Sequence, residues 1–201
     1  SCAPLLARTL QKLDPVDRGF THSQVMLFSV NPGASGYAGS RMFDFYESLK
    51  QGLSALPVVE NVSFSFSSPL SGNDSTTMIS RFGSNSIVHE NSRAHRNMVS
   101  PGYFGTIGIS LLAGRDFDSR DNGNAPKVAI VNEGFAKDKF GPESPIGKRL
   151  GYGPGQNSGP VEIVGVVADS KYDSLREQHV PMVYLPYKQF PPQAMTFELR
   201  V

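Results

Sequence analysis

The sequence predicts an α+β fold in which an α/β segment is followed by a segment made mostly of short strands. Residues 24–66 show a strand, a helix and a strand in succession, each with its own hydrophobic period. The turn-rich segment 67–77 ends this pattern, and short β-like runs follow it. The last residues, 195–201, alternate apolar and polar side chains again, which predicts a final strand.

The α/β segment begins with a predicted strand at 24–31, which Asn31-Pro32-Gly33 ends. A helix is predicted over 39–56, with Ser40 as its N-cap and Pro57 as its stop. An apolar stripe along it consists of Phe43, Tyr46, Leu49, Leu53 and Leu56. The run 58–66 then alternates valine and phenylalanine with serine, as expected of a strand with serines on its other face.

The β-rich segment opens with predicted strands at 78–82, 86–90 and 94–99. A short helix should follow, with Ser100 as its N-cap and Gly108 at its end. Phe104 and Ile107 should face inward from this helix, and the extended segment after it should complete a core. We therefore expect the apolar residues of 97–118 to be core residues rather than the wall of an active site.

The second half of the β-rich segment contains the most apolar runs in the chain. The run 126–132 predicts a buried strand, and Asn132 can cap a helix over 133–141. Another buried strand is expected at 161–170. The run 180–187 contains prolines, which lack a backbone N–H, and is therefore expected to be an edge strand.

Composition argues against several classes of partner. The chain has 201 residues, 39% of them hydrophobic, and a formal net charge of +1, so nothing predicts binding to nucleic acid. Cys2 is the only cysteine, which rules out a disulfide within the chain. No run approaches the roughly 18 apolar residues of a membrane span. Leucines at helical spacing in 1–13 fit either an amphipathic helix on the domain or the end of a longer helix cut off upstream.

No motif with a known chemistry is complete in the sequence. A calcium loop starting at Asp116 fails at its fifth, sixth and twelfth positions, so a solvated loop is the better interpretation. The four histidines are scattered, at positions 22, 89, 95 and 179, without zinc-like spacing.

The glycine-rich segments also lack their defining residues. Tyr37 stands where a nucleophile elbow needs its second glycine. Gln156 stands where a dinucleotide-binding fingerprint needs its third glycine. The sequence also contains no phosphate-binding P-loop motif. We therefore assign no catalytic, metal-binding or cofactor-binding residue, and we expect no enzyme activity and no cofactor.

The order of the blocks along the chain is more informative than any single motif. The blocks "YFGTIGISLLAGRDF", "VAIVNEGFAKDKFG", "PIGKRL", "VEIVGVVADS" and "VYLPY" resemble the periplasmic core domain of MacB/FtsX-like ABC transporter permeases. The beginning, "LLARTLQKLDPVDRGFTHSQVMLFSV", is similar to the stretch that leaves a transmembrane helix in the duplicated permeases of acidobacteria. The resemblance covers nearly the whole chain.

This resemblance implies a ferredoxin-like, porter-like α/β lobe interrupted by a mostly β insertion lobe. We expect the first lobe to comprise 1–67 and 193–201, with a helix and a strand beyond Val201 truncated, and the insertion to comprise 68–192. The chain should cross between the lobes at 67–77 and 188–194.

The resemblance also implies a non-catalytic, periplasmic domain of an inner-membrane protein. Its partners would be the membrane-embedded remainder of the permease, a cytoplasmic ABC ATPase and a periplasmic or outer-membrane protein, with a dimer in the full-length protein. ATP hydrolysis would be coupled to substrate export or partner activation. The alternative is a stand-alone periplasmic ligand-binding domain or a hydrolase whose site is not recognisable from the sequence.

One topological expectation follows for the last strand. In a split βαβ arrangement, 195–201 should lie between strands 24–31 and 58–66 and run antiparallel to both. The outer edge of 24–31 should then be bare or paired with a neighbouring molecule.

Overall fold

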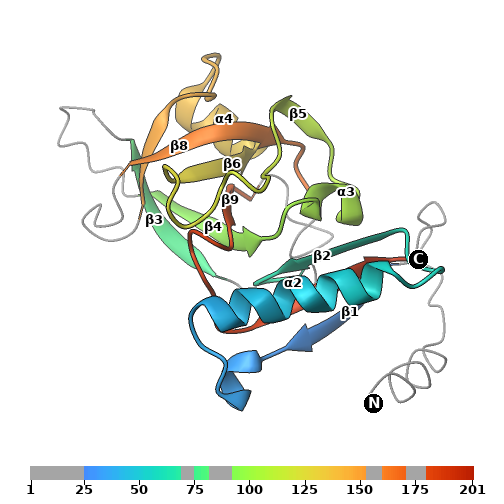
Figure 1. Cartoon of the computed structure of the whole chain (residues 1–201). Coiled ribbons are helices and arrows are strands. Elements are labelled where there is room, and N and C mark those ends of the chain that lie inside the picture. Colours follow the sequence, from blue (N-terminus) through green and yellow to red (C-terminus); the bar gives the residue numbers. More distant parts are fainter. Residues whose placement is uncertain (1–24, 69–74, 82–91, 153–159, 171–179) are drawn as a thin grey trace.

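The computed structural model describes residues 25–68, 75–81, 92–152, 160–170 and 180–201 (Figure 1). Within these residues one continuous sheet contains ten strands, and three α-helices and one short 3-10 helix accompany it. The fold is α+β and mostly β, as the sequence predicts. The predicted helix at 1–13 and the predicted strand at 86–90 lie outside the described residues.

Three antiparallel strands with a helix on one face form what we call the helix-covered sheet. Strand β10 (Met195–Arg200) lies between β1 (Val25–Val30) and β2 (Asn61–Ser65) and is antiparallel to both, so this prediction is confirmed. Phe197 pairs with Phe28 on one side and with Phe64 on the other. These three rings lie beneath the helix, where the Phe64 and Phe197 centroids are 5.0 Å apart.

The covering helix α2 (Ser40–Ser54) buries Tyr46 and Leu53 of its predicted stripe, whereas Leu56 lies beyond the helix and is exposed. Ser40 is not its N-cap, contrary to prediction. Gly39 occupies that position with a φ of +58°, and no side chain accepts a capping hydrogen bond there. A positive φ is costly for residues with a Cβ atom, so glycine fits the sharp entry into this helix. A 3-10 helix, η1 (Pro32–Ser35), connects β1 to this entry.

Six other strands close into a ring, which the sequence does not predict. They are β3 (Thr76–Arg81), β4 (Ser92–Val99), β6 (Val128–Asn132), β7 (Arg149–Tyr152), β8 (Pro160–Val167) and β9 (Met182–Pro186). The ring closes because β4 pairs with β3 on one side and with β9 on the other. Closure satisfies the edge hydrogen bonds that an open sheet would expose. Strand β5 (Leu111–Gly114) pairs with β8 outside this ring.

Alternate residues of the ring strands enter two different hydrophobic clusters. All six strands contribute to the larger cluster, which therefore fills the ring, and Val131 and Val183 belong to it. Ile130 and Tyr184, their neighbours in sequence, belong to a second cluster that includes Phe104 of α3 (Tyr103–Ile107). Strands β6 and β9 are buried on both faces for this reason.

Strand β9 was predicted to be an edge strand, and this prediction is wrong. It lies between β4, to which it is parallel, and β6, to which it is antiparallel. Its prolines explain why this is possible. Pro181 precedes the strand and Pro186 ends it, so the four residues between them keep their backbone N–H groups.

The segment that follows β4 differs from its prediction in two ways. Helix α3 begins at Tyr103 rather than after Ser100, whose hydroxyl instead accepts a hydrogen bond from the backbone N–H of Phe64. The helix ends at Gly108, and Phe104 is buried, as predicted. However, Leu111 and Leu112 do not belong to the core: they are 43% and 52% exposed on β5.

The helix after β6 agrees with its prediction. Helix α4 (Glu133–Phe140) begins after Asn132, whose side chain accepts a hydrogen bond from the backbone N–H of Phe135. Phe135 and Phe140 of this helix join the cluster that fills the ring. None of the helices in the described part of the chain has the length and apolar character that crossing a membrane requires.

Candidate functional site: the junction between sheet and ring

The contact between the helix-covered sheet and the strand ring, which we call the junction, concentrates the polar side chains that the fold buries. The sequence assigns no metal site, and the ranges described hold no group of three His, Cys, Asp or Glu residues that could bind a metal ion. The junction is built from packing, hydrogen bonds and charge.

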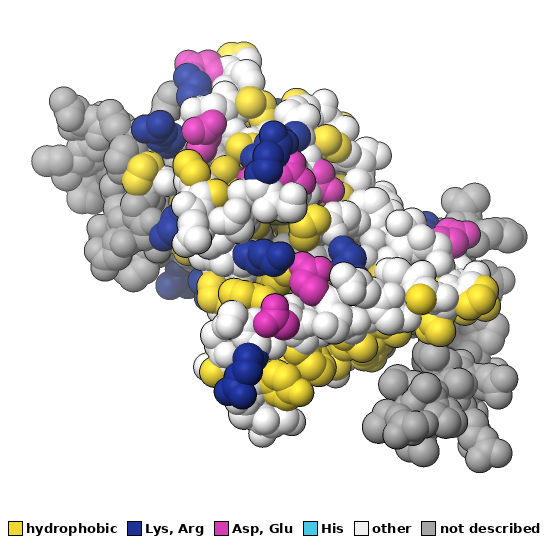
Figure 2. All heavy atoms as spheres, in the orientation of Figure 1, with side chains coloured by type: hydrophobic (Ala, Val, Ile, Leu, Met, Phe, Trp, Pro, Cys, Tyr) yellow, Lys and Arg dark blue, Asp and Glu magenta, His cyan; other side chains and the backbone are white. Residues whose placement is uncertain are grey.

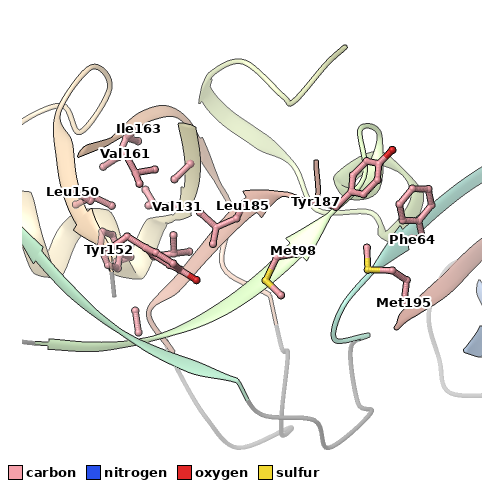
Figure 3. Packing of buried hydrophobic residues seen from close by; sticks show 14 of the residues in the cluster. Phe64, Met98, Val131, Leu150, Tyr152, Val161, Ile163, Leu185, Tyr187 and Met195 are labelled. Atoms are coloured by element: carbon pink, nitrogen blue, oxygen red, sulfur yellow. The ribbon is translucent and has the colours of Figure 1, made fainter. Parts of the chain in front are cut away.

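The two parts share one hydrophobic core at the junction. Phe64 and Met195 of the sheet meet Met98 and Tyr187 of the ring side (Figure 3). The rings of Phe64 and Tyr187 pack edge to face with centroids 4.8 Å apart, a favoured arrangement for aromatic pairs. The apolar residues beneath α2 and those inside the ring therefore belong to one continuous hydrophobic cluster.

Backbone groups and polar side chains join the two parts beside this core. Strands β2 and β4 share a single register pair, Ser65 with Val99. The Asn97 side chain extends this short contact: its Oδ1 accepts from the N–H of Ser67 (3.0 Å) and its Nδ2 donates to the carbonyl of Ser67 (2.7 Å). Asn97 thus replaces, with a side chain, the ladder bonds that the diverging strands cannot make.

A second polar contact joins β10 to α3. The Arg200 Nε donates to the carbonyl of Thr106 at 2.8 Å. A Cβ atom placed on Gly108, whose φ is +81°, would lie 3.2 Å from the Arg200 guanidinium. Glycine therefore both ends α3 and leaves space for the arginine.

A charged contact joins α2 to the end of β9. The Glu47 carboxylate accepts hydrogen bonds from the hydroxyl of Tyr187 (2.5 Å) and from Nζ of Lys188 (3.1 Å). Burial alone would raise the pKa of Glu47, but these two donors outweigh it and hold the pKa below its usual value. Burial and the neighbouring carboxylate both raise the pKa of Tyr187, so its phenol remains the donor.

Lys50, one turn further along α2, reaches the start of the α3 segment. Its Nζ donates to the carbonyl of Pro101 at 2.9 Å and lies 5.9 Å from the centroid of the Phe64 ring. Burial lowers its pKa, and the nearby carboxylates of Glu47 and Asp116 partly oppose this shift. One face of α2 therefore touches the ring side at two charged positions.

A buried carboxylate lies on the other face of the sheet. Glu198 of β10 is fully buried and accepts hydrogen bonds from the hydroxyls of Ser63 (2.8 Å) and Ser65 (2.5 Å) of β2. Burial raises its pKa to about 7, although the two serine hydroxyls oppose the shift. This group was not predicted from the sequence. Its only signal is a glutamate that the register places opposite Ser63, with Ser65 two residues further along β2.

The acidic loop 116–123 was expected to be a solvated loop, but part of it is buried. Asp121 is 5% exposed, and its carboxylate accepts two hydrogen bonds from the Arg115 guanidinium, at 2.7 and 2.8 Å. Asp118 pairs with Arg120 on the surface. Asp118 also lies 3.7 Å from the Arg115 guanidinium, so both carboxylates are paired with arginines.

Two hollows flank the junction. The smaller, of about 230 Å³, lies between α2 and the loop that contains Asp118, and both Glu47 and Lys50 line it. The larger, of about 550 Å³, lies on the side of Phe66 and Arg96. A third hollow, of about 540 Å³, lies at the start of α4 and away from the junction.

The fold is thus an antiparallel sheet, covered by one helix and interrupted by a closed strand ring that is tied to it by buried contacts. The family model for the MacB-like periplasmic core domain matches residues 11–200. The chain belongs to this family, and it is therefore a non-catalytic, periplasmic domain of an ABC transporter permease.

Solved structures with a similar fold include two bacterial transporter domains. The periplasmic region of MacB from Actinobacillus actinomycetemcomitans aligns with 77% of this chain and 64% of its own length, at 19% identity and a TM-score of 0.53. The extracellular domain of the noncanonical ABC-type transporter YknZ from Gram-positive bacteria aligns with 76% of this chain and 71% of its own, at 21% identity and a TM-score of 0.52. Among curated proteins, none matches the sequence.

Proposed function

We propose that this domain transmits movement from the membrane part of the permease to a partner or substrate in the periplasm. The energy would come from ATP hydrolysis by a cytoplasmic ABC ATPase. One observation carries this proposal: the helix-covered sheet and the ring share a core and four sets of polar contacts at the junction. Parts joined in this way move together, because a packed interior does not deform continuously.

The strand pairing supports the direction of this transmission. Strands β1 and β10 are neighbours, with Val25 paired to Arg200, so the described chain enters and leaves through the helix-covered sheet. We propose that this sheet lies nearer the membrane and that the ring extends away from it.

This proposal divides the chain into two lobes. The first comprises 1–67 and 193–201, and the second comprises 68–192. The crossings would be 67–77 and 188–194. The shared core at Phe64 and Tyr187 would then make the two lobes one mechanical body.

The proposed partners are the membrane-embedded remainder of the permease, the cytoplasmic ATPase and a periplasmic or outer-membrane protein. The full-length protein would act as a dimer. The domain would then cycle between positions set by the nucleotide state of the ATPase, and this movement would export substrate or activate the partner.

The test uses the full-length permease with its ATPase in lipid vesicles, in a background without other cysteines. Spin labels are placed at Ser48 on α2 or at Ser144 beyond α4, both of which are exposed. Distances between the two copies are measured with and without ATP. We expect both label positions to report an ATP-dependent change, and no change at either position would contradict the proposal.

A junction variant and a matched control variant test whether the junction transmits the movement. The double variant Glu47→Gln with Tyr187→Phe removes the charged contact of α2 with β9. This double variant should preserve the ATP-dependent change in the distance between Ser48 labels. It should weaken or broaden the change in the distance between Ser144 labels. Asp44→Asn changes an exposed carboxylate on the same helix and should leave both changes intact. Equal behaviour of the two sets of variants would contradict a role for this contact.

A further inference from the structure

We propose that the larger hollow beside the junction binds a small amphipathic anion, with an apolar body and a carboxylate. This inference does not depend on the mechanical function proposed above. The hollow has a volume of about 550 Å³ and is lined by Phe66, which follows β2, and by residues of β4, β7 and the segment that leads to β10. Sites for small ligands have volumes of roughly 300–1,000 Å³.

The body of the hollow is apolar and aromatic. Its lining includes Phe66, Met98, Phe190, Pro191 and Pro192. In Figure 3 the side chain of Tyr152 extends along the ring toward Met98, and both line this hollow. Tyr152 and Phe190 pack edge to face with centroids 5.1 Å apart, which holds one aromatic wall in place.

Arg96 is the only charged residue among the described residues that line the hollow. Its side chain is half-buried and makes two hydrogen bonds, from Nε to the hydroxyl of Ser75 and from Nη1 to the hydroxyl of Tyr152, both at 2.9 Å. Both acceptors are neutral. Among the described residues, no carboxylate forms an ion pair with Arg96.

The chemistry of this arginine indicates the charge of the ligand. A guanidinium carries five N–H donors in a rigid fork, and two of them are used here. The remaining donors suit the two oxygens of a carboxylate, and a charge-assisted pair is stronger than a neutral one. An apolar body would lie against Phe66 and Phe190, so neither part of an amphipathic anion would lack a partner.

The charge of the ligand can be tested on the unmodified 201-residue chain. Decanoate, decanol and decylammonium are titrated below the concentrations at which they form micelles, and binding is measured by calorimetry. The chain should bind decanoate about tenfold or more tighter than decanol, because a hydrogen bond to a charged group is worth about 1.5–3 kcal/mol. Decylammonium should bind more weakly than either.

Arginine variants test whether the ligand binds beside Arg96. Arg96→Gln should reduce decanoate affinity to that of decanol, whereas Arg96→Lys should keep part of the preference for the anion. Arg93→Gln is the matched control, because Arg93 is exposed on the same strand. If Arg96→Gln fails to fold, the ligand series on the unmodified chain decides the question alone.

Three results would overturn the proposal. Equal binding of decanoate and decanol would show that the anion is not recognised. An equal loss of decanoate affinity in Arg93→Gln and Arg96→Gln would show that the overall positive charge of the protein, and not Arg96 in particular, attracts the anion. Tighter binding of an apolar tetrapeptide with a blocked, uncharged carboxyl end than of decanoate would assign the hollow to an uncharged peptide instead.

Discussion

Glu198 shows how much a single buried side chain can depend on its surroundings. It lies on the face of β10 opposite Phe197, where the register places Ser63 directly across from it. Its ionised form has lost contact with water and is compensated mainly by two neutral hydroxyls, with smaller contributions from a backbone hydrogen bond and from the charge of Lys50. The folded protein therefore binds a proton at this position more tightly than the unfolded chain does.

This difference predicts a pH-dependent stability. The pKa of Glu198 rises from 4.5 to about 7 on folding, so its contribution is fully present below pH 4.5 and is lost as the pH rises to 7. Unfolding by urea should show that Glu198→Gln gains stability relative to the unchanged protein over this range, by on the order of 3 kcal/mol. The gain should level off above pH 7. A difference between the two proteins that does not vary with pH would contradict the prediction.

At the scale of elements, β5 depends on a glycine where it runs beside β8. Gly114 has a φ of +75°, and a Cβ atom there would lie 2.1 Å from the carbonyl oxygen of Val164. Gly114→Ala should therefore lower the free energy of unfolding by about 2 kcal/mol or more. Gly52→Ala is the control: it lies in α2 with nothing within 4 Å and should be stabilising by up to about 1 kcal/mol. A neutral result at position 114, measured by thermal unfolding, would contradict the described path of β5.

Strand β1 has an outer edge that no described residue pairs with. Hydrophobic side chains gather along the side of the molecule where α2 and β1 lie (Figure 2), and Leu27 is 47% exposed. We expect the isolated chain to self-associate through this edge at high concentration, and Leu27→Lys should weaken the association. Sedimentation velocity measures it, with Ser48→Lys on α2 as a control of equal charge. A monomer at every concentration would contradict this expectation.

The sequence predicts those helices and strands that a local pattern of residues marks. The position of β10 follows from its alternation and from the split βαβ arrangement, and Asn132 caps α4 as expected. Closure of the ring does not follow, because the pairing of β4 with β9 joins residues far apart in sequence. The prolines of β9 and the leucines of β5 were misinterpreted because local composition does not show which neighbours an element will have.

The junction was less predictable than the strands. Glu47 and Tyr187 are 140 residues apart, and Thr106 and Arg200 are 94 apart. No local pattern marks such pairs, since each member has an ordinary place in its own helix or strand. The family resemblance predicted the class of protein, but it named no residue that joins the helix-covered sheet to the ring.

At the scale of the whole molecule, we propose that the helix-covered sheet and the ring move as one rigid body. The most direct test is the distance between spin labels at Ser48 and Ser144 within one copy of the full-length permease, with and without ATP. The shared core at Phe64 and Tyr187 predicts one narrow distance distribution that is the same in both states. A shift of this distance between the two states would show that the two parts move separately and would contradict the account.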